Sequence, residues 1–328
     1  MHAVVKILIA LFGVVFVFFA LVFVLNTGDV VPSTKSLQIA DSVKAMPGYN
    51  LTNLPRPAMA LEGVGESVLY SDYVYSREKM DELLLANANV VDELVKAYKI
   101  RTVEVVVKHE VPLRESSQAR NAHKLFLLHV SQLIATEKGK LAENLLLNSN
   151  EFLLSVVESP QMFLPKLTAL DLFEMNARFV ADLVASKKVL KASSELKASL
   201  RIAPPITQII ETAMKGEFIA AKSVVEYSKA VGPAFAFSDA DGGSRGNPAL
   251  EKFLLRPEET MNWFAQIYSD IQEPACDLAK LAKCSAVYAA EIENPNVIQI
   301  LSNPVGRKLV QIMMPNPQFT RDKLQSKV

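Results

Sequence analysis

The sequence is poor in the residue types that most often mark a chemical function. It has 12 glycines, two cysteines, four histidines and one tryptophan among 328 residues, and its 35 lysines and arginines match its 35 aspartates and glutamates. The lack of net charge argues against nucleic-acid binding, which is expected to need a basic surface. Glycine occurs at about half its usual frequency, so tight turns are few and long helices are favoured. Four histidines leave little material for a metal site, and we predict no cofactor.

The two cysteines, Cys276 and Cys284, are spaced too widely for a CxxC redox or zinc motif. In an oxidising compartment an even number of cysteines favours a disulfide. On one continuous helix, however, their Cα atoms would lie roughly 12 Å apart, whereas a disulfide needs less than about 7 Å. Pro274 interrupts the segment just before Cys276. The sequence therefore leaves open both a local disulfide and a pair of buried thiols.

The most informative feature that is present is an unbroken apolar run over residues 7–25. As a helix it would be roughly 29 Å long, about the thickness of a bilayer's hydrocarbon core. It is longer than the apolar part of a usual secretory signal, and VLNTGDVVPS at its end offers no small-x-small cleavage site. No cysteine lies nearby, which excludes a lipid-anchored N-terminus. We predict a single transmembrane signal anchor at 7–25.

The flanks of this run bear on the orientation of the chain in the membrane. Lys6 precedes the run, and Asp29, Lys35 and Lys44 follow it, so the positive-inside contrast is weak. The short stub 1–6 most simply stays in the cytoplasm. We therefore expect a single-pass protein of the inner (plasma) membrane whose C-terminal part is extracytoplasmic, and periplasmic in a bacterium.

The next segment, 26–70, contains several prolines and no lasting helical or strand period, which predicts a stalk or an ordered arm. From residue 71 onward apolar residues recur at helical spacing. The β-rich piece at 101–113 has no partner strand and is interpreted as an extended connector or a frayed helix end. Helices are predicted over 76–98, 117–149, 167–200 and 206–230, with further starts at Pro248, Pro257 and Pro304.

Together these segments predict an all-α fold: one transmembrane helix followed by a globular domain, 71–328, of about seven or eight helices. Strands and helices do not alternate along the chain, which argues against an α/β fold. One helix face carries four aromatic and aliphatic residues, Trp263, Phe264, Ile267 and Tyr268. They are expected in the core, and the alternative is a groove that binds a partner.

This order of features resembles a set of uncharacterised bacterial proteins that carry one N-terminal transmembrane helix and an all-helical extracytoplasmic domain. The resemblance rests on the anchor and on four segments of this chain, YSDYVYS, KAYKIR, PPITQIIETAMKGEF and NPVGRKLVQIMMPNPQF. It implies the same topology, and it implies no activity and no binding residue.

Two groups of side chains are candidate contact sites. A basic stretch is suited either to anionic lipid headgroups or cell-wall polymers or simply to solvent, and consists of Lys187, Lys188, Lys191, Lys197 and Arg201. His123 and His129 lie about 240° apart around a helix and cannot bind one metal from the same face, so hydrogen-bonded or solvated histidines are expected.

No nucleophile, acid–base pair or cofactor cradle is recognisable in the sequence. The hypothesis that follows is a membrane-anchored envelope protein that acts by binding, as a scaffold, adaptor or assembly factor, with another envelope protein as its partner. The alternative is an envelope hydrolase or cell-wall enzyme whose site is assembled from scattered carboxylates such as Glu211 and Glu217. We assign no catalytic residue from the sequence.

Overall fold

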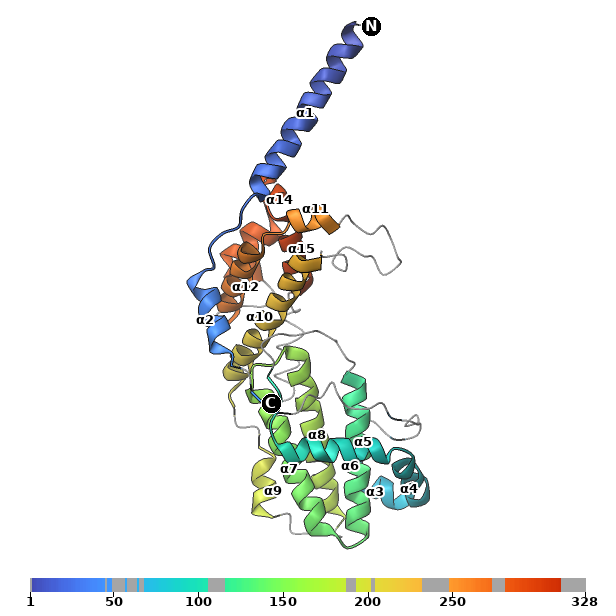
Figure 1. Ribbon diagram of the computed structural model, residues 1–328. Helices are drawn as coiled ribbons and strands as arrows, with labels where there is room; N and C mark the ends of the chain where they lie inside the picture. The colour runs from blue at the N-terminus through green and yellow to red at the C-terminus, as the bar shows by residue number, and fades with distance from the viewer. Residues whose placement is uncertain are drawn as a thin grey trace. The chain divides into compact units, whose positions relative to one another are not determined.

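The computed structural model describes residues 2–44, 46–48, 57, 64, 68–105, 116–186, 193–201, 204–231, 248–272 and 281–313. These residues form helices joined by short connections (Figure 1), which confirms the predicted all-α class. The β-type pairing within these ranges is one isolated bridge between Met46 and Val105.

The chain divides into two compact units where the sequence predicted one domain. Unit 1 comprises Met1–Ser42 and Phe218–Phe319, and unit 2 comprises Val43–Glu217 and Thr320–Val328. The division arises because helix α2 (Thr34–Ser42), near the N-terminus, packs against helix α12 (Pro257–Gln272), near the C-terminus. A pairing between segments so distant in the chain leaves no local sequence pattern.

In unit 2, helices α5, α6, α7 and α8 pack on one another. Their shared core is aromatic, since the ring centroids of Tyr98 and Phe126 lie 4.9 Å apart and those of Tyr98 and Phe152 5.5 Å apart. The helices of this unit are α3 (Tyr70–Tyr75), α4 (Arg77–Ala86), α5 (Ala88–Ile100), α6 (Ser116–Ala135), α7 (Gly139–Glu158), α8 (Phe163–Ala185), α9 (Ser194–Ser199) and α10 (Ile206–Val231) up to Glu217.

The predicted number of helices, about seven or eight, is too low because polar residues interrupt several predicted helices. Asn87 separates α4 from α5 within one helical period: its buried side chain donates to the Leu83 carbonyl at 2.9 Å. Its backbone N–H donates to the carbonyls of Leu83 and Leu84. An asparagine that satisfies local backbone groups in this way competes with continuation of the helix.

The described start of the β-rich piece, 101–105, is an extended connector, one of the two forms expected for the whole piece. Arg101 ends the helix in a left-handed conformation with φ 62°. Val105 then exchanges two backbone hydrogen bonds with Met46, at 3.0 and 3.1 Å. The remainder of this piece, from residue 106, lies outside the described residues.

In unit 1, α12 packs against α2 and against the two helices α13 and α15. Phe264, Ile267 and Tyr268 are fully buried and Trp263 is 9% exposed, so the predicted aromatic core face is confirmed. The helices of this unit are α1 (His2–Asn26), α2, α10 from Phe218, α11 (Pro248–Phe253), α12, α13 (Leu281–Cys284), the π-helix η3 (Tyr288–Glu293), α14 (Val297–Leu301) and α15 (Pro304–Met313). Pro248, Pro257 and Pro304 each begin a helix, as predicted.

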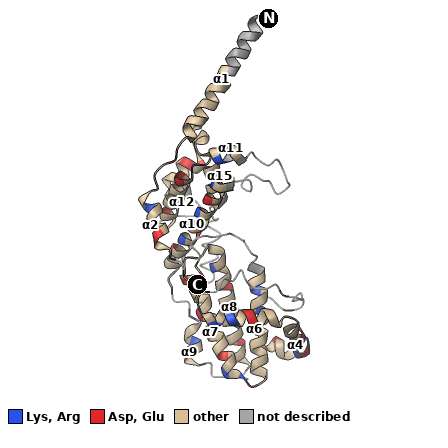
Figure 2. Ribbon diagram, viewed as in Figure 1, with Lys and Arg blue, Asp and Glu red and all other residues tan. Residues whose placement is uncertain are grey.

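Helix α1 exposes apolar side chains around its circumference. From Val14 to Val24 the large apolar side chains that it exposes are between 43% and 69% accessible. Figure 2 shows no charged residue over residues 13–26 of this helix. Within the described ranges, no helix reaches the length and apolarity that crossing a membrane requires.

The segment predicted as a stalk or arm is described over 26–44 and 46–48, at residues 57 and 64, and from Val68. Its first part lies against α12, where the Ser33 N–H donates to Asn262 Oδ1 at 2.6 Å and Asn262 Nδ2 donates to the Val31 carbonyl at 3.0 Å. Between Asn26 and Ser42 the chain is therefore an ordered arm of unit 1. A free spacer would make no such contacts.

Candidate functional site

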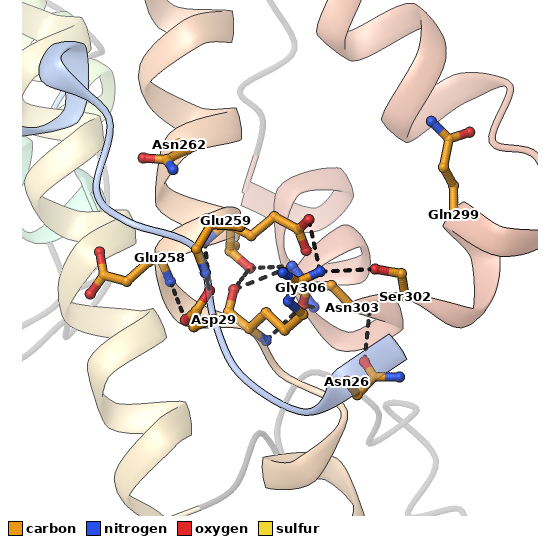
Figure 3. Close-up of polar contacts among 12 residues, drawn as sticks. Asn26, Asp29, Glu258, Glu259, Asn262, Gln299, Ser302, Asn303 and Gly306 are labelled. Carbon is orange, nitrogen blue, oxygen red and sulfur yellow. Dashed lines mark hydrogen bonds and ion pairs between the residues drawn. The ribbon is translucent and has the colours of Figure 1, made fainter. Parts of the chain in front are cut away.

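A partly buried polar cluster lies where α1 meets the rest of unit 1 (Figure 3). It joins the end of α1, the start of α12 and the connection between α14 and α15. We call it the polar junction and define it as Asn26, Asp29, Arg256, Glu259, Thr260, Ser302 and Asn303.

Asn303 is the centre of the polar junction and is fully buried. Its side-chain oxygen accepts from the backbone N–H groups of Arg256, at 2.9 Å, and Gly306, at 3.1 Å. The bond to Gly306 makes Asn303 the N-cap of α15. Its side-chain nitrogen donates to Thr260 Oγ1 at 3.0 Å. Asn303 has a φ of 51°, a left-handed conformation that asparagine tolerates better than most residues.

Gly306 allows α15 to approach α12 closely. A Cβ atom at this position would lie 2.0 Å from Thr260 Oγ1 and 2.4 Å from Asn303 Oδ1. Any larger residue would therefore displace two members of the polar junction. The helix start predicted from Asn303 and Pro304 is correct, but the need for glycine is visible only in the packing.

Asn26 attaches the end of α1 to the junction. Its side-chain nitrogen donates at 2.8 Å both to the Val22 carbonyl in α1 and to the Leu301 carbonyl in α14. Its side-chain oxygen accepts from the Asn303 N–H at 2.9 Å. One turn earlier, the ring of Phe23 stacks on that of Phe253 in α11, with centroids 5.2 Å apart. Polar and apolar contacts together hold the last turn of α1 in place.

Asp29 caps α12 from the other end of the sequence. Its carboxylate accepts from the backbone N–H of Glu258 at 2.7 Å and from that of Glu259 at 3.1 Å. These are free donors of the first helical turn, where a negative charge also interacts favourably with the helix dipole. The sequence predicted a helix start at Pro257 and contained no sign that Asp29 would satisfy it.

The junction also contains charged groups that burial perturbs. Arg256 Nη1 lies 3.1 Å from Glu259 Oε1 and donates to Ser302 Oγ at 3.2 Å. Burial raises the pKa of Glu259, and nearby Arg256 partly opposes that rise. Burial likewise lowers the pKa of Arg307, whose guanidinium lies 5.5 Å from the centre of the Trp263 ring. The side chains of Arg256 and Glu259 are partly buried, at 17% and 19% exposed, and an ion pair in such a place is weak evidence for added stability.

A second buried polar network lies in unit 2 around His123, which is hydrogen-bonded, one of the two states expected for it. His123 Nδ1 lies 2.7 Å from the Tyr98 hydroxyl, and His123 Nε2 lies 3.0 Å from Asn176 Oδ1. Asn176 in turn donates to Ser149 Oγ and Asn150 Oδ1. Burial lowers the pKa of His123 to about 4. The histidine is therefore neutral at pH 7 and has partners on both ring nitrogens.

Unit 2 contains a buried amine, Lys166, that was not predicted from the sequence. Lys166 Nζ donates to the carbonyls of Val157 and Ser159 and to Thr212 Oγ1, so it caps the end of α7. Burial lowers its pKa to about 7. Nearby, a Cβ at Gly216 would lie 2.4 Å from the backbone carbon of Gln161, so only glycine fits here. Nothing in the local sequence, FLPKLTAL, distinguishes this lysine from an exposed one.

The two carboxylates proposed for a hydrolase site have separate surroundings. Glu211 is about half exposed and pairs with Lys215 at 2.7 Å. Glu217 accepts from the Phe163 N–H at 2.9 Å, and burial raises its pKa to about 7. Six residues apart on α10, the two side chains point to different faces. Glu217 thus caps α8 and does not form a catalytic pair with Glu211.

The remaining predicted site residues are described only in part. Lys197 and Arg201 are exposed, whereas Lys187, Lys188 and Lys191 lie outside the described residues. Cys284 is disulfide-bonded, and the sequence has one other cysteine, Cys276, which lies outside the described residues. Their pairing stays a prediction.

In the described part of the chain, no group of three or more histidine, cysteine, aspartate or glutamate side chains is placed to hold a metal ion. The polar junction links three parts of unit 1: the end of α1, the start of α12 and the connection between α14 and α15. Comparison with known families, with curated proteins and with solved structures finds no match for this chain.

Proposed function

We propose that this protein is a membrane-anchored envelope protein that acts by binding another envelope protein, as a scaffold, adaptor or assembly factor. In this proposal α1 is the anchor, inserted in the inner membrane, and the rest of the chain is extracytoplasmic. The observation that carries it is the exposed apolar surface of α1, whose end is fixed by the polar junction.

The energetic argument begins with the side chains of α1. Burying one valine, leucine or phenylalanine side chain is worth about 1.5–3 kcal/mol, and α1 exposes nine such residues between Val14 and Val24. A helix that is apolar all round needs an apolar environment. The sequence continues this pattern back to residue 7, which gives a length suited to the hydrocarbon core of a bilayer.

The polar junction supports the binding part of the proposal. Asn26 is hydrogen-bonded to α14, and Asp29 is hydrogen-bonded to α12. These bonds fix the end of the anchor relative to the helices of unit 1. A protein that holds a partner at a defined place near a membrane needs such a coupling.

The anchor is tested with the double variant Phe16→Arg, Phe19→Arg. Each arginine at the centre of a membrane helix costs about 2.5–3.5 kcal/mol of insertion free energy. We expect the wild-type chain to stay in the membrane fraction after alkaline carbonate extraction and the double variant to be released. The control is Tyr75→Arg, Leu85→Arg, which charges two residues that are 93% and 82% exposed outside α1. Extraction of the wild-type chain would contradict the anchor.

Binding is tested separately, by placing a photo-crosslinking amino acid at the exposed residues Leu85, Ile100 and Leu141 in living cells. We expect an adduct with another envelope protein from at least one position on the extracytoplasmic part. If a survey of the exposed positions yields no protein adduct while the chain is in the membrane, the binding proposal is wrong and the anchor stands.

A further inference from the structure

Helix α14 presents three large β-branched side chains to solvent. Val297 is 72% exposed, Ile298 61% and Ile300 50%. The polar residue among them, Gln299, is turned to other groups, since its side chain donates to Glu291 Oε1 at 2.8 Å and accepts from the Asn296 N–H at 2.8 Å. The helix thus has one exposed apolar surface, which we call the α14 surface and define as Val297, Ile298 and Ile300.

The position of α14 is defined by α1. The Leu301 carbonyl, at the end of α14, accepts from Asn26 at 2.8 Å, and the Asn303 N–H that follows donates to the same side chain. Figure 1 shows α14 and α11 beside the end of α1 that joins unit 1. On α11, Leu250 is 53% exposed, and Phe253 stacks on Phe23 of α1. Exposed apolar side chains therefore gather around the last turn of α1.

We propose that the α14 surface contacts the boundary between lipid headgroups and acyl chains of the membrane that holds α1. This inference rests on the proposed anchor. Asn26 is the first polar residue after the apolar run and would lie where the run leaves the hydrocarbon. A segment hydrogen-bonded to Asn26 lies at the same depth. Interfacial segments of this kind bury their apolar side chains about 5–10 Å into the boundary region.

The lipid boundary is favoured over a protein partner by this continuity. Asn26, in the last turn of α1, is hydrogen-bonded to Leu301 at the end of α14, so an anchor inserted up to its last turn brings α14 to the bilayer. The transfer of exposed isoleucine and valine side chains from water into an adjacent apolar phase lowers the free energy. A second copy of this chain covering the same surface is the competing outcome of the test.

The test uses the full-length chain reconstituted in vesicles of phosphatidylcholine and phosphatidylglycerol, with a tryptophan introduced by Val297→Trp. The matched control is Leu37→Trp, which replaces an exposed apolar residue of α2, also in unit 1. Vesicles carry a spin label near the headgroup end of the acyl chain, and iodide serves as the quencher in water. Emission of the unchanged chain, from Trp263, is subtracted.

We expect the tryptophan at position 297 to lose emission to the lipid quencher and to be protected from iodide, whereas the one at position 37 shows the reverse. The inference is overturned if position 297 responds to iodide like position 37, or if both respond equally to the lipid quencher. It is also overturned if position 297 is protected from both quenchers, which would indicate a second copy. A chain that does not float with the vesicles at all would instead refute the anchor.

Discussion

His123 is a residue whose chemistry is set by its burial. Its Nε2 lies near an amide oxygen, which only accepts, so this nitrogen carries the proton, and Nδ1 accepts from the Tyr98 hydroxyl. Desolvation of the fully buried ring lowers the pKa of His123 to about 4, and hydrogen bonds to Asn176 and to the Leu172 backbone partly oppose that fall.

This pKa predicts a pH dependence of stability. Between about pH 6.5 and pH 4 the unfolded chain protonates this histidine and the folded chain does not, so the free energy of unfolding falls as the pH is lowered through this range. For the shift to about 4 the loss is about 3 kcal/mol. Denaturant unfolding measured from pH 7 to pH 4 checks this value.

The control for this measurement is His123→Gln, which keeps a polar side chain and cannot titrate. We expect the variant to be less stable at pH 7 but to lose less stability on acidification than the wild-type chain. If both proteins lose the same free energy over this pH range, the acid sensitivity comes from other groups.

At the scale of helices, the start of α12 depends on a residue from the N-terminal arm. Pro257 supplies a first position that lacks an N–H, and Asp29 accepts from the next two N–H groups. Asn262 holds the same arm one turn later through Val31 and Ser33. The arm and the helix therefore stabilise each other, and neither is complete alone.

Asp29→Ala tests this dependence. Loss of a capping carboxylate costs about 1 kcal/mol, and we expect faster amide hydrogen exchange at Glu258 and Glu259. The matched control is Asp41→Ala, which removes an exposed carboxylate from α2 of the same arm. Equal exchange rates in both variants would show that water replaces Asp29 at no cost.

At the scale of the whole molecule, each unit has its own buried core. Leu94 in unit 2 is 1% exposed, and Phe264 in unit 1 is fully buried. Side chains in such cores are close-packed, so replacing one by a smaller side chain weakens the packing of the side chains around it. Because the chain is divided into two units, we predict that such a substitution destabilises only the unit that contains it.

We predict that Leu94→Ala lowers the free energy of unfolding of unit 2 by about 2–5 kcal/mol, and Phe264→Ala that of unit 1 by about 3–5 kcal/mol. Residue-resolved hydrogen exchange of the full-length chain should show α6 and α7 losing protection in the first variant and α12 and α15 in the second. Loss of protection in both units from either substitution would mean that the chain unfolds as one cooperative body.

The features that the sequence determined by itself are local ones. The spacing of apolar residues specifies helices and their core faces, as at Trp263 to Tyr268, because neighbours on a helix lie within four residues of each other. Proline specifies helix starts at Pro248, Pro257 and Pro304, because its ring restricts one backbone angle. The apolar run near the N-terminus likewise predicts an anchor from composition and length alone.

Only the tertiary structure decided which of these segments meet. The bonds from Asp29 to the start of α12 and from Asn26 to Asn303 join residues more than two hundred positions apart. Many polar residues are equally able to cap a helix or satisfy a carbonyl, so local sequence cannot select the partner. The selection is made when the apolar faces of α2, α12 and α15 pack together, because that packing brings the polar groups of the junction within bonding distance.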